Sequence, residues 1–223
     1  MLHEGFTRQH RMLGRAAAFT VFFLLIAYAV TLVLGFISLK SPSDPIGDPF
    51  FSILELLIVV TAPLMVIVMI AVHAYASPET KMYSLTALVF MVLMASITCT
   101  VHFVILTVSR QIESAGFPWF SLFFSFKWPS VTYTMDILAW DVFFALSMLF
   151  AAPVFKIGRL EKTVRILMIV SGLLSLAGLI GVPLANMNVR NIGILGYAGV
   201  SMIVFLLLGI VFGRTQQLPE EAR

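Results

Sequence analysis

The chain has 223 residues, of which 60% are apolar or aromatic, and it carries 14 Lys and Arg against 11 Asp and Glu. Soluble domains are about half apolar and about a quarter charged, so this composition excludes an ordinary soluble protein. Together with a mean hydropathy of +1.03, it indicates an integral membrane protein. The single Cys, Cys99, excludes an internal disulfide, a Cys-based zinc site and dithiol redox chemistry.

Six apolar stretches are long enough for the about 20 helical residues that cross a hydrocarbon core. They are continuously apolar, whereas the strands of a membrane barrel alternate at every second residue. We therefore expect an all-α protein with one membrane domain over residues 1–223, built as a bundle of six transmembrane helices. The expected helices cover residues 16–39, 50–76, 83–109, 131–155, 163–185 and 191–213.

The distribution of basic residues between the loops predicts the orientation, because Lys and Arg are retained on the cytoplasmic side. With the N-terminus inside, the outer segments carry Lys40, Arg110, Lys127 and Arg190. The remaining basic residues all fall on the inner side. We therefore expect both termini in the cytoplasm and the bundle in the plasma membrane. The inner basic residues are Arg8, Arg11, Arg15, Lys81, Lys156, Arg159, Lys162, Arg165, Arg214 and Arg223.

The connection between the third and fourth spans, residues 111–130, is crowded with aromatic side chains. Aromatic rings are enriched at membrane interfaces, so we expect this segment to lie on the outer surface as an interfacial anchor. The alternative is a lid over a cavity that opens to the outer leaflet. The aromatic residues are Phe117, Trp119, Phe120, Phe123, Phe124, Phe126 and Trp128.

Two further patterns predict how the helices pack. Pro63 interrupts the second span and frees a backbone carbonyl near Val59, which a neighbouring group should satisfy. Small residues at helical spacing in the fifth and sixth spans mark close approach of two backbones in lipid. These residues are Ser171, Gly172, Ser175, Gly178 and Gly181 in the fifth span, and Gly193, Gly196 and Gly199 in the sixth.

The charged residues inside the spans are Glu55, Asp136, Asp141 and Arg165. Arg165 is near a membrane surface and can extend its guanidinium to water. The three acids and His102 all fall in the outer half of three consecutive spans, and intramembrane ionisable groups by default suggest a site or a buried pair. We expect these four residues to bind a ligand or a proton in a polar pocket that opens outward.

Helical periodicity separates the two aspartates of the fourth span. Tyr133, Asp136 and Trp140 share one face, while Asp141 is about 140° away from Asp136 on an α-helix. Either the pocket wraps around this helix or one aspartate has a different partner. Near mid-membrane, the carboxyl group of Asp141 must be protonated, paired or hydrated.

His102 is at a depth that allows a pair with Asp136 or Glu55. Thr98 lies one helical turn away on the same face and Arg110 two turns further out, so both are candidate lining residues with Tyr133 and Trp140. Three of these residues also have a simpler explanation: Glu55 and Asp136 lie near helix N-termini, where the dipole favours a carboxylate, and a histidine such as His102 often only packs.

The residues between the fifth and sixth spans are interpreted as a polar turn on the outer face. They are Asn186, Asn188, Arg190 and Asn191. An alternative places them at the rim of the pocket.

The pattern favours binding or transport of a small solute or amphiphile through the polar pocket. One alternative is a structural or accessory subunit of a membrane complex. A second is a metal-dependent enzyme that uses His102 with the acids, although no local ligand spacing such as HExxH occurs. The expected partners are the lipid bilayer and a small molecule or lipid, with a partner subunit or a second copy as an alternative and no nucleic acid. No motif identifies a cofactor or a catalytic residue.

Overall fold

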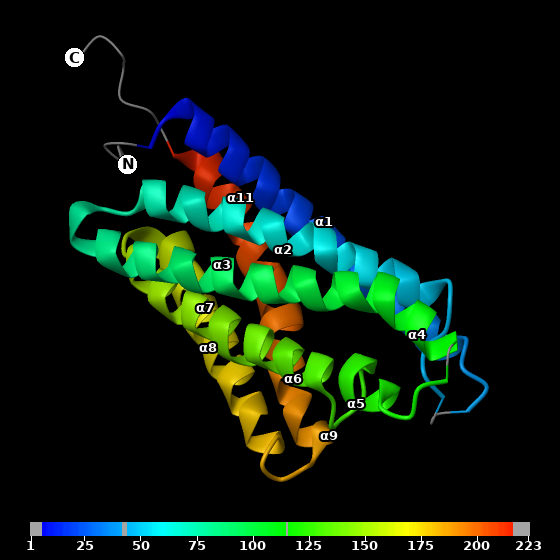
Figure 1. Ribbon diagram of the computed structural model, residues 1–223. Helices are drawn as coiled ribbons and strands as arrows, with labels where there is room; N and C mark the ends of the chain where they lie inside the picture. The colour runs from blue at the N-terminus through cyan, green and yellow to red at the C-terminus, as the bar shows by residue number, and fades with distance from the viewer. Residues whose placement is uncertain (1–5, 42–43, 115, 216–223) are drawn as a thin grey trace, which may run out of the picture.

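The structure is a computed structural model that describes residues 6–41, 44–114 and 116–215 (Figure 1). In these ranges all regular structure is helical, and six helices are long and apolar enough to cross a membrane. The prediction of an all-α chain with six membrane-spanning helices is therefore confirmed. The spans are Arg8–Ile37, Phe50–Tyr75, Pro78–Ile112, Val131–Val154, Gly158–Gly181 and Met187–Arg214.

The first two spans are the single helices α1 (Arg8–Ile37) and α2 (Phe50–Tyr75), and the other four are composite. The third joins η1 (Pro78–Thr80), α3 (Lys81–Val104), η2 (Ile105–Ser109) and α4 (Arg110–Ser114), and the short helix α5 (Phe120–Phe124) follows it. The fourth joins α6 (Val131–Ile137), η3 (Leu138–Phe144), α7 (Ala145–Ala151) and η4 (Ala152–Val154). The fifth joins α8 (Gly158–Gly178) and η5 (Leu179–Gly181), and the sixth joins α9 (Met187–Arg190), α10 (Ile192–Ile194), η6 (Leu195–Val200) and α11 (Ser201–Arg214).

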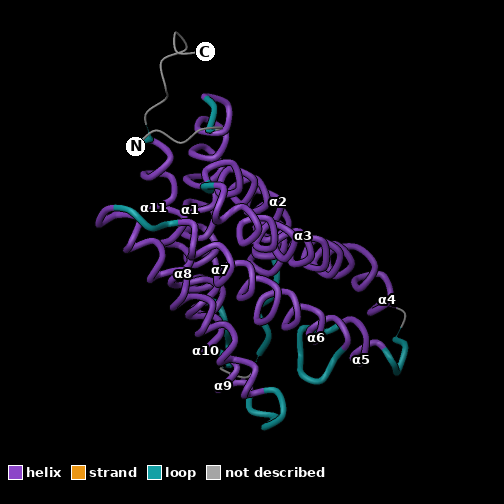
Figure 2. Tube along the Cα trace, turned by 90° about the vertical axis from the view of Figure 1, so that its left-hand side faces the viewer, coloured by secondary structure: helices purple, strands orange, loops and turns teal. Residues whose placement is uncertain are grey.

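The helices pack in a continuous series. α1 lies against α2 and α11, α2 against α3, α3 against α7, α7 against α8, and α8 against α11 (Figures 1 and 2). The two described ends of the chain meet, because the Phe6 and Phe212 rings are 5.7 Å apart and Arg11 donates to the Thr215 carbonyl at 3.4 Å. The α5 and α9 segments lie at the opposite end of the bundle (Figure 1).

The outside of the bundle is apolar, as the composition requires for a protein in lipid. In the most apolar stretch of α1, only 17% of the residues are buried by the rest of the chain. Side chains such as Phe23 and Phe36 are exposed. These residues face the bilayer, where an exposed apolar side chain has no desolvation cost. The interior is filled by large apolar side chains, among them Phe144, Phe155, Phe205 and Met168.

Small residues bring the fifth and sixth spans together, as the spacing predicts. A Cβ on Gly196 would lie 2.5 Å from the carbonyl oxygen of Ser171, and the Ser171 hydroxyl donates to the Gly196 carbonyl at 2.8 Å. Gly199 does not take part, because a Cβ there would meet open space. The prediction of a close helix contact is confirmed for Gly196, and interhelical hydrogen bonding accompanies it.

The carbonyl released by Pro63 also finds a partner. The Cys99 thiol of α3 lies 3.7 Å from the carbonyl oxygen of Val59, which is the group that would accept a hydrogen bond from residue 63 in an uninterrupted helix. This confirms the expectation from sequence and gives the single cysteine a structural role.

Candidate functional site

Five ionisable side chains form one connected cluster inside the bundle, which we call the ionisable cluster: Glu55, His102, Asp136, Asp141 and Arg190. They come from α2, α3, α6, η3 and α9. Their exposed fractions are between 0% for Asp141 and 9% for Asp136. The cluster is thus shielded by the chain itself, at the end of the bundle away from the described chain ends (Figure 1).

His102 lies between two carboxylates. Its Nδ1 is 2.7 Å from Oε2 of Glu55, and its Nε2 is 3.4 Å from Oδ1 of Asp136. An imidazole can donate to both sides only when both ring nitrogens carry a proton. This geometry therefore favours the imidazolium form, and it places His102 against both of the acids that the sequence offered as alternative partners.

Arg190 joins the two aspartates of the fourth span. Its Nη2 is 3.0 Å from Oδ2 of Asp141 and 3.8 Å from Oδ2 of Asp136. The same guanidinium lies 5.3 Å from the centre of the Tyr133 ring and 5.6 Å from that of Tyr197. Stacking on aromatic faces suits arginine, whose charge is weakly hydrated, and it helps to hold the guanidinium away from water.

The two aspartates reach one partner because the fourth span is not a regular α-helix. Residues Leu138–Phe144 form a π-helical segment, in which hydrogen bonds join residues five apart. Asp136 and Asp141, which an α-helix would place about 140° apart, can then turn toward the same arginine. The expectation that the two aspartates lie on separate faces of the helix is therefore corrected, because the π-helical segment has more residues per turn than an α-helix.

Glycines make the space for Asp141. A Cβ on Gly178 would lie 2.5 Å from Oδ1 of Asp141, and a Cβ on Gly193 would overlap the same oxygen. Gly178 ends α8 and Gly193 lies in α10, so the carboxyl group packs against two backbones. Two of the small residues that the sequence assigns to helix packing therefore also shape the cluster.

Arg190 is the member that the sequence placed in a polar turn and, only in the alternative interpretation, at the rim of the pocket. The interpretation of residues 186–191 as a polar turn holds for Asn186, whose side chain accepts from the backbone N–H groups of Asn188 and Val189. Arg190, however, lies at the end of α9 and is only 3% exposed. One feature of the sequence could have identified Arg190. It lies at the start of a span, at the depth of three acids for which no arginine or lysine partner had been assigned.

The other candidate lining residues have different positions. Tyr133 lies beside Arg190, and Trp140 contacts the Tyr197 ring at 5.3 Å, so both border the cluster. Thr98 is fully buried and its hydroxyl lies 3.5 Å from Sδ of Met94.

Arg110, in α4, does not contact the ionisable cluster. Its guanidinium instead contacts residues at the start of α2. It pairs with Asp48 at 3.1 Å and donates to the Ser52 hydroxyl at 2.6 Å. The Ser52 hydroxyl donates to the Asp48 carboxylate, which also accepts from the Ser52 backbone N–H at 3.1 Å. These two bonds, together with Arg110, hold the pKa of the Asp48 carboxyl below its ordinary value. Arg110 thus contributes to a hydrogen-bonded cap at the surface.

The aromatic connection reaches the ionisable cluster through one residue. The Phe126 ring stacks on His102 with centroids 5.3 Å apart, and it also meets Tyr133 edge-on at 6.2 Å. Five other aromatic residues of this segment pack on one another, namely Phe117, Trp119, Phe120, Phe123 and Phe124. The segment therefore covers the His102 side of the cluster.

The cluster does not have the arrangement of a metal centre. Among residues 6–41, 44–114 and 116–215, no three His, Cys, Asp or Glu side chains are placed to hold a metal ion. The physical reason is that both nitrogens of His102 already face carboxylate oxygens. The metal-dependent alternative therefore has no ligand set in the described part of the chain.

Comparison with known proteins finds no family model, no curated protein and no solved structure that matches the chain. The functional argument therefore depends on the cluster itself.

Proposed function

We propose that this membrane protein binds a proton at the ionisable cluster and uses it in proton-dependent binding or transport of a small solute. The observation that supports the proposal is the composition of the cluster. Glu55, Asp136 and Asp141 face one guanidinium and one imidazole, so one carboxyl group is in excess even when His102 is protonated.

An excess negative charge is unfavourable at this position. All three acids are at most 9% exposed and lie in helices that cross the bilayer. A carboxylate without a compensating charge in such surroundings is strongly destabilised, and uptake of a proton removes the charge. The proton belongs to the connected group as a whole, because interacting acids titrate together.

The cluster also has unused hydrogen-bonding capacity. Four buried polar atoms lack a hydrogen-bond partner within the described residues: Nε2 of His102, Oδ1 of Asp136, Oδ1 of Asp141 and Nε of Arg190. Buried polar atoms in stable proteins are normally satisfied, and exceptions gather at functional sites. The two carboxyl oxygens can take up the added proton, and the two nitrogen atoms can donate to a polar group of a solute.

The accessory-subunit alternative receives less support from this geometry. A carboxylate that paired with a partner helix would lie on the outside of the bundle. Glu55 and Asp141 instead pair inside this chain, with His102 and Arg190.

Proton uptake by the purified protein tests the proposal. We expect the wild type to bind about one proton more than Asp141→Asn between about pH 9 and about pH 5. Asp44→Asn removes an exposed loop carboxylate and serves as the matched control, with uptake in that range unchanged. Equal uptake by wild type and a folded Asp141→Asn would overturn the proposal.

A screen of small solutes tests the second part of the proposal. Thermal stability is measured with each solute at two pH values. A solute that the protein carries together with a proton should stabilise the wild type in a pH-dependent way and Asp141→Asn in a pH-independent way.

We also propose that both chain ends face the cytoplasm and that the protein is in the plasma membrane. The basic residues gathered near the described chain ends support this orientation, for example Arg8, Arg11 and Arg214. A reporter fused to the C-terminus that is active only in the cytoplasm would give a signal, and a reporter active only outside would give none.

A further inference from the structure

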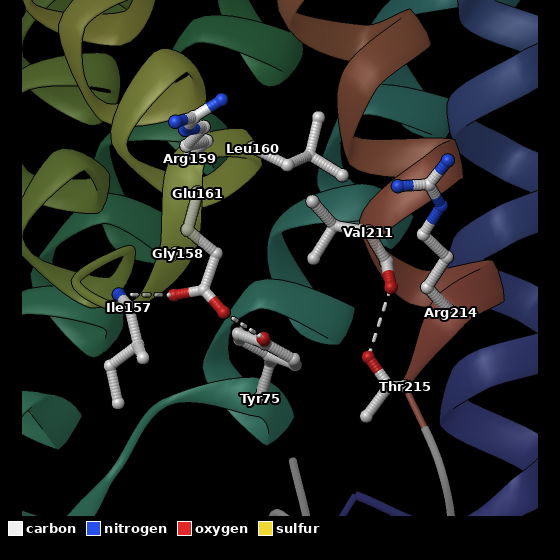
Figure 3. A pocket seen from close by; sticks show the side chains of 9 residues that line it. All are labelled: Tyr75, Ile157, Gly158, Arg159, Leu160, Glu161, Val211, Arg214 and Thr215. Carbon is white, nitrogen blue, oxygen red and sulfur yellow. Dashed lines mark hydrogen bonds between the residues drawn. The ribbon is translucent and has the colours of Figure 1, made fainter.

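A second polar feature lies at the other end of the bundle, and it is independent of the ionisable cluster. A cavity of about 370 Å³ opens between the end of α2, the start of α8 and the end of α11 (Figure 3). Arg159 and Arg214 are among the residues that line it. The volume falls within the range of sites that hold small molecules.

The acid in this cavity already has its hydrogen-bonding partners. Oε1 of Glu161 accepts from the Tyr75 hydroxyl at 2.7 Å. Oε2 accepts from the backbone N–H groups of Lys156 and Ile157, both at 3.0 Å, and Figure 3 draws the bond from Ile157. Glu161 thereby fixes the loop before α8 onto α2, and it makes no ion pair with either arginine of the cavity.

The two arginines are available to a ligand. Both are exposed and belong to different helices, α8 and α11, and Figure 3 shows them on opposite sides of the cavity. Neither guanidinium group has an ion-pair or hydrogen-bond partner among the residues that the structure describes, and the carbonyl of Arg159 accepts from the Thr163 hydroxyl at 2.9 Å. A third guanidinium is close, because Arg11 donates to the carbonyl of Thr215, which lines the cavity. The cavity therefore has an excess of positive charge.

The backbone at the N-terminus of α8 adds N–H hydrogen-bond donors to those of the arginines. Gly158 begins α8 in the cavity wall, and Ile157 before it provides no side-chain cap to the first turn. Free N–H groups at a helix N-terminus favour an anion, and guanidinium groups match the oxygens of a phosphate.

We propose that this cavity binds a phosphate group, carried by the headgroup of an anionic phospholipid. The cavity lies at the end of membrane-spanning helices, and apolar residues such as Ile157, Leu160 and Val211 line it beside the arginines. A lipid can place its phosphate on the arginines while its glycerol and chains follow the apolar side. Inorganic phosphate has the same charged group without the apolar part.

Native mass spectrometry of the full chain with added lipid tests the site. Phosphatidylglycerol should be retained in preference to phosphatidylcholine. Arg159→Gln/Arg214→Gln should weaken this retention about tenfold, since each basic residue near an anionic lipid contributes a separate attraction. The control Arg8→Gln/Arg165→Gln removes the same charge from exposed positions outside the cavity and should change retention less than about twofold.

Three results would overturn the proposal: no preference for phosphatidylglycerol, equal losses in the two double variants, or displacement of the lipid by inorganic phosphate. The last result would identify free phosphate as the ligand. The single variants Arg159→Gln and Arg214→Gln should each give an intermediate loss, which keeps the test decisive if the double variant does not fold.

Discussion

Asp141 and Arg190 lie 49 positions apart in the chain and meet at 3.0 Å in the interior, where the first is 0% and the second 3% exposed. This contact joins the fourth span to the start of the sixth. It also gives Asp136 a cationic neighbour, because the same nitrogen of Arg190 lies 3.8 Å from that acid. Removing one partner leaves the other buried without its counter-charge, so the losses from removing each partner separately should not add.

The first prediction concerns this pair. Arg190→Gln should destabilise the protein by about 3–5 kcal/mol, because it leaves two buried acids without their cation. Asp141→Asn should cost less, since the amide oxygen can still accept from Arg190. In the double variant the total loss should fall short of the sum by about 0.5–3 kcal/mol. Reversible unfolding in mixed micelles measures all four proteins, and additive losses would show that the two side chains are not coupled.

The second prediction concerns the glycines around Asp141. Gly193→Ala and Gly178→Ala should each destabilise the protein by about 1–3 kcal/mol, because the added methyl group meets the carboxyl oxygen. Gly199→Ala is the matched control, since its Cβ meets open space. It should be neutral or stabilising by up to about 1 kcal/mol, as for alanine in other helices. Thermal unfolding of the three variants distinguishes overlap at the cluster from a general effect of alanine.

The third prediction tests the cover over His102. Phe126→Ala removes the ring that stacks on the imidazole, so the C2 hydrogen of the His102 imidazolium should exchange faster with deuterium from the solvent. Phe123→Ala removes a ring from the same segment that is 41% exposed and packs on Trp119. It should leave the exchange rate of His102 unchanged. Mass spectrometry of the labelled peptide gives the rates, and equal rates in the two variants would mean that Phe126 does not shield the cluster.

Features that depend on neighbouring residues in the chain could be predicted from the sequence, whereas contacts between residues far apart in the chain could not. The six spans were predictable because apolar length is a local property of the chain. The depths of Glu55, His102 and Asp136 follow from the same helices, and these three do meet. The role of Arg190 was not predictable, since it requires the chain to turn back into the bundle at α9.

The joint contact of Asp136 and Asp141 with Arg190 was missed for a second reason. Periodicity assumes an α-helix, and the π-helical segment Leu138–Phe144 departs from it. The function of Arg110 was likewise assigned from its depth, whereas its charge pairs with Asp48. Depth alone does not tell which of several nearby acids a long side chain reaches.

The fourth prediction concerns pH and the start of α2. Because the pKa of the folded Asp48 carboxyl is lowered, its contribution to stability is present above the unfolded value of about 3.9 and is lost as the pH falls through the folded value. Asp48→Asn should therefore lower stability at neutral pH, by less than about 1 kcal/mol because the group is exposed. The difference from wild type should disappear at acidic pH. A difference that persists or grows there would contradict the assignment.

The central claim is that the ionisable cluster holds a proton on one of its acids, and infrared spectroscopy detects that proton directly. We expect the wild type at neutral pH to show the C=O stretching band of a protonated carboxylic acid, shifted in heavy water. Asp141→Asn, Asp136→Asn and Glu55→Gln should each abolish the band, because loss of any one acid removes the excess. A wild type without this band, or a band that remains in all three folded variants, would contradict the claim.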